Sequence, residues 1–176
     1  RLALHEVGHT LGLNHNFKGS YLHNNEDVHN PDITSKVGVT ASVMEYPAIN
    51  IAPLGVEQGD YYDTIPGPYD IWAIKYGYTP GLDEEELAEI IAEQNKPEHM
   101  FANDSEDMRS PGRGIDPRAM INDLTNDPIT YAINRIELIN HTQKNIVPKL
   151  EDTAETFEEY RLALSIFMRE YSRQLE

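Results

Sequence analysis

One pattern near the start of the chain, H-E-x-x-H-x-x-G-x-x-H, constrains its local fold more than any other feature. Its first part, His5-Glu6-Val7-Gly8-His9, places two imidazoles four residues apart. On a helix, side chains at that spacing lie on one face, one turn apart. The apolar residues around them predict a helix over residues 1–12. Both imidazoles could then bind the same metal ion.

A further histidine at position 15 requires the chain to leave that helix. A continued helix would carry the third imidazole roughly 15 Å along the axis from the first, which is too far for a shared ion. Gly12 permits the positive φ angle of a turn, so that His15 can come back to the ion. We therefore predict a zinc site of His5, His9 and His15 whose fourth position is open to water or substrate.

Glu6 supplies a possible proton acceptor beside this site. Its position next to the first histidine predicts that its carboxylate faces the open side of the metal, where it can act as a general base. Three neutral imidazoles leave the zinc its full charge, which favours acidification of a bound water. The five-residue part of the motif alone is a weak signal, and the longer pattern makes it specific.

Two downstream segments extend the match. Ser42-Val43-Met44-Glu45-Tyr46-Pro47 follows the motif, and residues 69–78 carry Tyr-Asp-Ile-Trp-Ala-Ile-Lys-Tyr-Gly-Tyr. Together with the long motif, they resemble the metzincin clan of zinc endopeptidases, with its methionine turn and its last catalytic-domain helix. The resemblance implies that Met44 forms a floor under the imidazoles. It also implies that Tyr46 reaches the metal or the reacting oxygen, although Tyr46 could instead merely pack beside Met44.

The resemblance implies a domain organisation. It covers residues 1–78, which correspond to the C-terminal subdomain of a metzincin-like α/β catalytic domain, and leaves residues 79–176 as a helical extension. The sheet-bearing subdomain is expected upstream, so this chain is expected to be a fragment of a larger protein. His15-Asn16-Phe17 and the Ser-Val-Met-x-Tyr-Pro turn resemble a poorly described family of large bacterial zinc metalloproteases. That likeness implies an extracytoplasmic (secreted, periplasmic or cell-surface) location.

The fold class predicted from the pattern is predominantly α with long irregular loops. Asp70 is expected to cap one helix, with Ile71 and Ile74 on its buried face and Gly77 as its stop. This helix is predicted over residues 69–76. Further helices are predicted over residues 84–95, 118–123, 128–145 and 153–175, and loops over residues 13–41, 48–68 and 96–127.

Composition excludes several classes of function. The net charge of −16 argues against nucleic acid and anionic membranes as partners. The absence of cysteine excludes disulfides and thiolate chemistry, and no apolar run is long enough for insertion in a membrane. The expected partner is a peptide or protein substrate.

Two functional hypotheses follow. The first is a zinc-dependent endopeptidase in which metal-activated water hydrolyses a peptide bond with Glu6 as base and the isolated 176 residues have little activity. The alternative is a non-catalytic protein-binding module with a structural or vestigial zinc site, against which the intact Glu6 speaks. The four remaining histidines are expected at the surface or in hydrogen bonds. A second metal site near His23 and His29 is the open alternative for two of them.

Overall fold

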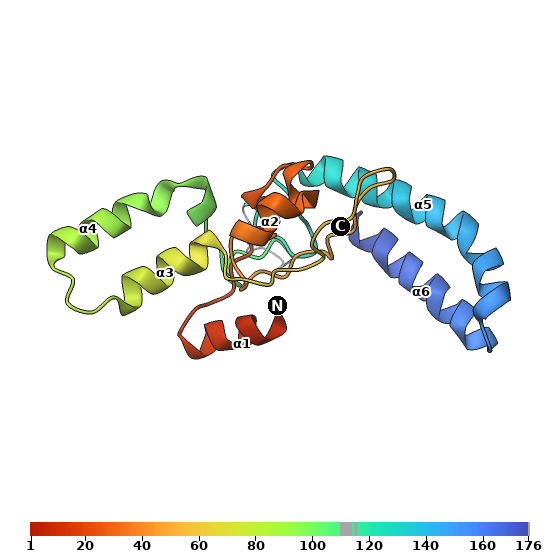
Figure 1. Cartoon of the computed structure of the whole chain (residues 1–176), viewed down its shortest axis with the longest axis horizontal. Helices are drawn as coiled ribbons and strands as arrows, with labels where there is room; N and C mark the ends of the chain where they lie inside the picture. The colour runs from red at the N-terminus through yellow and green to blue at the C-terminus, as the bar shows by residue number, and fades with distance from the viewer. Residues whose placement is uncertain (110–113, 115, 176) are drawn as a thin grey trace. The chain divides into compact units, whose positions relative to one another are not determined.

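The computed structural model of the protein describes residues 1–109, 114 and 116–175, and within these ranges it contains helices and no strand (Figure 1). This agrees with the predicted, predominantly α fold class. The α/β character of a parent catalytic domain stays a prediction. The chain forms two compact units, one of Arg1–Ala52 with Val56–Asp127 and one of Pro53–Gly55 with Pro128–Glu176. The predicted domain boundary after residue 78 also stays a prediction.

The first unit begins with the helix that carries the histidine motif. Its first elements are α1 (Leu2–Thr10), η1 (Gly19–Leu22), η2 (Asp27–His29) and α2 (Pro31–Val37). The predicted irregular loop over residues 13–41 is therefore wrong where α2 forms. The Asn30 side chain accepts a hydrogen bond from the Asp32 N–H, and Pro31 occupies the first turn. Both features favour a helix start.

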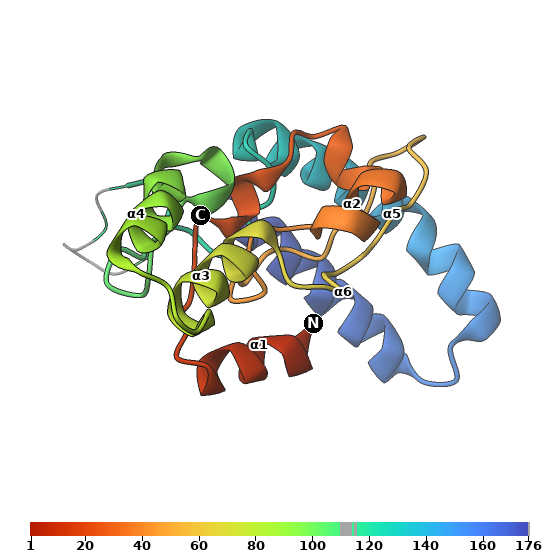
Figure 2. The ribbon, with the colours of Figure 1, turned by 60° about the vertical axis from the view of Figure 1, so that its left-hand side comes forward.

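Two further helices of the first unit run side by side, α3 (Pro68–Tyr78) and α4 (Glu84–Ala92), followed by η3 (Glu93–Asn95) and η4 (Pro97–His99) (Figures 1 and 2). The Trp72 indole donates a hydrogen bond to the Ile90 carbonyl at 2.8 Å. The indole also stacks on His99, with 4.9 Å between the ring centroids. These contacts hold the pair of helices to the polypeptide that follows it.

The expected details of α3 are partly wrong. Gly67, not Asp70, is its N-cap residue. Ile71 is 61 % exposed, whereas Asp70 is buried. Gly77 does not end the helix, which continues to Tyr78 and stops before the extended Thr79. A residue that precedes proline is disfavoured in the helical region, and Pro80 therefore sets this end.

The short helix predicted over residues 118–123 does not form. Asn122 and Thr125 have positive φ angles of 63° and 75°. The Asn122 N–H donates to the Tyr46 carbonyl at 2.9 Å, and the Thr125 N–H donates to the Ser20 carbonyl at 2.9 Å. Backbone hydrogen bonds to distant loops thus replace the helix, and this segment lies along the methionine-containing turn.

The second unit is a helical pair, α5 (Pro128–Thr153) and α6 (Phe157–Arg173), which lie antiparallel (Figures 1 and 2). Arg135 and Glu170 join the two helices through an ion pair of 2.7 Å. The predicted end of α5 near residue 145 is wrong, because the helix continues through Pro148. Proline removes one hydrogen bond from a helix without having to end it.

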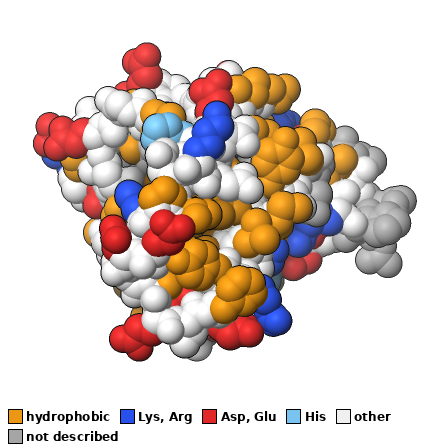
Figure 3. Space-filling model, turned by 90° about the vertical axis from the view of Figure 1, so that its right-hand side faces the viewer, with side chains coloured by type: hydrophobic (Ala, Val, Ile, Leu, Met, Phe, Trp, Pro, Cys, Tyr) orange, Lys and Arg blue, Asp and Glu red, His pale blue; other side chains and the backbone are white. Residues whose placement is uncertain are grey.

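Many apolar side chains of α6 are exposed, including Leu162, Leu164, Ile166 and Met168. Hydrophobic side chains also gather, between charged ones, on the face of the molecule shown in Figure 3. Within the described part of the chain, no helix has both the length and the apolar character needed to cross a membrane.

Candidate metal centre

A tight turn closes α1 between the second and third histidines. Gly12 has a φ angle of +86°. Its N–H donates to the His9 carbonyl at 3.0 Å, and the Leu13 N–H donates to the Gly8 carbonyl at 3.0 Å. These two bonds form a Schellman motif, which requires a left-handed residue at this point. A Cβ atom at Gly12 would meet nothing within 4 Å, so the backbone conformation alone requires the glycine. The predicted turn is confirmed.

This turn brings the three imidazoles together. His5, His9 and His15 each offer one ring nitrogen, and these atoms lie within 4.8 Å of one another. The ring centroids are separated by 4.8 to 5.4 Å. No other group of three metal-ligating side chains occurs in the described ranges. The cluster could hold a metal ion.

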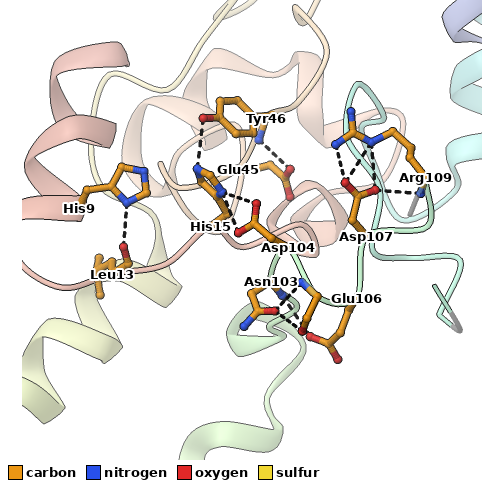
Figure 4. Close-up of polar contacts among 11 residues, drawn as sticks. His9, Leu13, His15, Glu45, Tyr46, Asn103, Asp104, Glu106, Asp107 and Arg109 are labelled. Atoms are coloured by element: carbon orange, nitrogen blue, oxygen red, sulfur yellow. Dashed lines mark hydrogen bonds and ion pairs between the residues drawn. The ribbon is translucent and has the colours of Figure 1, made fainter. Parts of the chain in front are cut away.

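The outer nitrogen of each ring is held by an oxygen of the protein. The Nδ1 atom of His5 lies 2.7 Å from the Val43 carbonyl oxygen. Figure 4 shows the other two contacts, 3.0 Å from His9 to the Leu13 carbonyl, and 2.9 and 3.0 Å from His15 to the two Asp104 carboxylate oxygens. Such contacts favour the tautomer in which Nδ1 carries the proton and the unprotonated Nε2 can bind a metal.

The most buried of these rings provides a test of the fit. The Nε2 atom of His5 is buried and has no hydrogen-bond partner among the described residues. Buried polar atoms are rarely left unpaired, so an unpaired nitrogen that faces two other imidazoles fits a metal ligand. Burial lowers the pKa of His5, and the nearby His9 and His15 act in the same direction. The neutral, metal-binding form is therefore favoured.

Met44 lies directly against α1. Its side chain is fully buried, and a Cβ atom added at Gly8 would lie 2.3 Å from its Sδ atom. A glycine at this position of the motif therefore lets the methionine approach the helix. The position of Met44 beside the helix of the first two histidines agrees with the expected floor.

Asp70 holds the methionine-containing turn in place. Its carboxylate accepts hydrogen bonds from the Ser42 hydroxyl at 2.6 Å, the Val43 N–H at 2.8 Å and the Gly67 N–H at 2.9 Å. Burial raises the pKa of Asp70, and these hydrogen bonds oppose the rise. Because the Val43 carbonyl contacts His5, Asp70 connects α3 to the first imidazole through a single residue, Val43.

The predicted base and the predicted tyrosine face one cavity beside the cluster. The cavity has a volume of about 390 Å³ and is lined by Arg1, Leu2, His5, Glu6, Tyr46 and Tyr62. The Tyr46 hydroxyl lies 3.2 Å from Nε2 of His15 (Figure 4). Tyr46 thus contacts the imidazoles themselves, besides following Met44 in the turn.

A buried pair of carboxyl groups lies behind this turn, which sequence reasoning missed. Glu45 is fully buried and accepts hydrogen bonds from the N–H groups of Tyr46 at 2.7 Å and Ser20 at 3.2 Å. Asp123 accepts one from the Ser20 hydroxyl at 3.2 Å, and its Oδ1 atom is buried without a partner in the described ranges. Burial raises the pKa of Glu45 well above its usual value and that of Asp123 to about 7.

The remaining histidines have other surroundings. His23 contacts the Gly38 carbonyl at 2.8 Å, and His99 contacts the Glu93 carbonyl at 2.9 Å. Both are buried, as is His29, whereas His141 is exposed. The structure does not gather His23 and His29 into a metal-binding group within the described ranges. Hydrogen bonding is therefore the better interpretation for His23 and His99.

Comparison with known proteins gives one match. A family model described as Met-zincin matches residues 1–176, the whole chain. No curated protein and no solved structure matches this chain.

Proposed function

We propose that this chain, which belongs to the Met-zincin family, is a zinc-dependent endopeptidase with Glu6 as its general base. The family points to a metallopeptidase-like domain and to zinc binding. The specific activity and the roles of the individual residues are the proposal. Peptides or proteins are the substrates that such a domain implies.

One observation carries the proposal. The three histidines turn one ring nitrogen each toward a common point, while their other nitrogens are occupied by protein oxygens. That arrangement has three protein ligands and room for one more, as in catalytic zinc sites. A bound zinc ion would supply Lewis acidity, which lowers the pKa of water and polarises a carbonyl group.

In this proposal, Glu6 accepts and donates the proton. Its side chain is exposed and lines the cavity beside His5. Its carboxylate accepts a proton from the attacking water and delivers it to the departing amine. The Tyr46 hydroxyl, at the edge of the imidazole cluster, donates a hydrogen bond to the substrate carbonyl oxygen as negative charge develops there. His5, His9 and His15 hold the zinc ion in this proposal.

The cellular setting rests on the resemblance alone. A bacterial origin, export from the cytoplasm and a sheet-bearing subdomain in a parent protein stay proposals. So does the low activity expected of the isolated 176 residues.

Metal content tests the site. We expect about one zinc per chain in the wild-type protein, retention of zinc in Glu6→Ala and loss in His15→Ala, measured by elemental analysis after gel filtration. Loss of zinc in Glu6→Ala as well would make Glu6 a ligand instead of a base.

Cleavage of an unstructured protein tests the reaction. We expect the isolated 176 residues to hydrolyse casein only slowly. This hydrolysis should depend on added zinc, stop with chelator and be lost in Glu6→Gln, which keeps the size of the side chain but not its basicity. A zinc-loaded protein whose cleavage persists in Glu6→Gln would contradict the role of Glu6. A zinc-loaded protein that cleaves nothing, both by itself and within its longer parent protein, would favour the non-catalytic binding module.

A further inference from the structure

The third histidine differs from the other two in the group that holds it. His5 and His9 contact backbone carbonyls, whereas His15 contacts a carboxylate. Both carboxylate oxygens of Asp104 lie within hydrogen-bond distance of the His15 Nδ1 atom, at 2.9 and 3.0 Å (Figure 4). Among the outer contacts of the three imidazoles, this one alone carries a charge.

We propose that Asp104 is a positioning residue of the metal site, which orients His15 and strengthens it as a zinc ligand. This inference rests on the proposed zinc site. A carboxylate that accepts the Nδ1 proton fixes the ring orientation and makes Nε2 a better electron donor. A neutral carbonyl also fixes the ring orientation, but it strengthens electron donation by Nε2 less.

The chain around Asp104 is anchored on the residue that follows the third histidine. Asn16 is fully buried, and its amide donates to the Met100 carbonyl at 3.0 Å and accepts from the Ala102 N–H at 3.3 Å. The Asn16 N–H donates to the Met44 carbonyl at 3.2 Å. One asparagine thus ties the segment that carries Asp104 to the methionine-containing turn.

Phe17 adds an apolar anchor to the same segment. Its N–H donates to the Ala102 carbonyl at 2.8 Å. Its ring belongs to a buried cluster with Ala102 and Ala119, against which Ile121 packs. The backbone two residues before Asp104 is therefore fixed to the residues that follow His15.

The backbone after Asp104 is also held. Asn103 accepts hydrogen bonds from the N–H of Ser105 at 2.9 Å and from its hydroxyl at 2.6 Å. The Asn103 N–H donates to Glu106 at 3.1 Å. The Asp104 side chain itself is 67 % exposed, so burial does not force it toward His15. The fixed backbone therefore holds the solvent-exposed Asp104 carboxylate close to the His15 imidazole.

A surface ion pair is the competing explanation. In that case, Asp104 would contact His15 only when the imidazole is protonated, and it would contribute little to metal binding. The two explanations differ in what removal of the carboxylate does to zinc affinity.

The test compares the zinc affinity of four proteins by competition with a chromophoric chelator at one pH. They are the wild-type chain, Asp104→Ala, Asp104→Asn and the control Asp32→Asn. Asp32 is an exposed aspartate in the first turn of α2, so the control removes the same charge elsewhere in the first unit. We expect Asp104→Ala to weaken zinc binding by about 10- to 100-fold. Asp104→Asn should lie between it and the wild type, and Asp32→Asn should bind as the wild type does.

Two further measurements separate positioning from folding. The melting temperature of the metal-free protein should be nearly the same in all four, because the Asp104 side chain is exposed. The visible absorption bands of the cobalt-loaded protein should change in Asp104→Ala and not in Asp32→Asn, because they report ligand geometry.

Three results would overturn the inference. Equal zinc affinity in the wild type and Asp104→Ala would leave the zinc site intact and make Asp104 a surface ion-pair partner. A fall in the metal-free melting temperature that accounts for the whole loss of affinity would make its role structural. If the wild-type chain itself bound no zinc, the proposed function would fail together with this inference.

Discussion

At the scale of single residues, Gly12 determines whether the third histidine can return to the other two. Its φ angle of +86° costs an L-residue roughly 1–2 kcal/mol. Because a Cβ atom there would meet nothing within 4 Å, Gly12→Ala isolates this backbone cost from crowding. We expect a loss of roughly 1–2 kcal/mol in the free energy of unfolding, measured by urea denaturation of the metal-free protein, and weaker zinc binding.

Gly77 provides the matched control. It lies within α3, a Cβ atom there would also meet nothing within 4 Å, and its φ angle is not positive. Alanine is favoured over glycine in a helix by roughly 0.5–1 kcal/mol, so Gly77→Ala should stabilise the protein and leave zinc affinity unchanged. If both variants changed stability in the same direction, the backbone explanation of Gly12 would be wrong.

The spacing of the histidines was readable from the sequence because helical geometry and one glycine determine it locally. Asp104 was not, since it contacts His15 across 89 residues of chain and no local pattern marks it. The pairing of Glu45 with Asp123 was hidden for the same reason. Local periodicity predicts which residues share a helix face, and the packing of distant loops decides which carboxylate meets which imidazole.

At the scale of elements, α3 acts as the support of the methionine-containing turn through Asp70. Asp70→Ala removes the acceptor of three hydrogen bonds and leaves buried donors unpaired. We expect a loss of about 1–3 kcal/mol in the free energy of unfolding. Zinc affinity should fall several-fold as well, because Val43, whose carbonyl contacts His5, loses the hydrogen bond that its N–H donates to Asp70.

Asp83 is the control for the loss of an aspartate at a helix start. It caps α4, and its carboxylate accepts from the N–H groups of Glu85 and Glu86 at 3.0 and 2.9 Å. Asp83→Ala should cost about 0.5–2 kcal/mol and leave zinc affinity unchanged. Equal effects of the two variants on zinc affinity would show that Asp70 does not support the site.

Helix existence was predicted better than helix boundaries. Helices α1, α4 and α6 were expected close to where they form, because their apolar and capping patterns are local. The expected helix over residues 118–123 failed because its N–H groups find partners in distant loops, such as the Tyr46 carbonyl. For α3, the apolar residues alone misplaced the buried face, since the first unit buries Asp70 and exposes Ile71.

At the scale of the whole molecule, the buried carboxyl pair links stability to pH. An aspartate has a pKa of about 3.9 in an unfolded chain, whereas burial raises that of Asp123 to about 7 in the folded protein. The folded state therefore holds a proton that the unfolded state has already lost. The stabilising contribution is complete below pH of about 4 and is lost as the pH rises through about 7.

Comparison with Asp123→Asn measures the contribution of this pair, because the substitution removes the charge of Asp123 and its effect on the pKa of Glu45. The lowered pKa of His5 acts in the opposite direction, but it is present in both proteins and cancels in the comparison. We expect Asp123→Asn to be more stable than the wild type at pH 8. The difference in the free energy of unfolding between the two proteins should become smaller toward pH 5. Urea unfolding of the metal-free proteins across this range measures it. The wild-type unfolding equilibrium should shift relative to the variant by up to about tenfold per pH unit. A wild-type advantage at pH 8 would contradict the prediction.

The variant Asp116→Asn is the reference for this comparison, because its change in stability is expected to have the opposite sign. Arg118 and Lys18 hold the pKa of this carboxyl well below its usual range, with Lys18 at 2.8 Å. A lowered pKa stabilises the folded state above the pKa of the unfolded chain, so Asp116→Asn should be less stable than the wild type throughout pH 5 to 8. In a chain of net charge −16, removal of any negative charge relieves general repulsion. Opposite signs for Asp123→Asn and Asp116→Asn would therefore assign the effect to the local surroundings of each carboxyl group, and equal signs would assign it to overall charge.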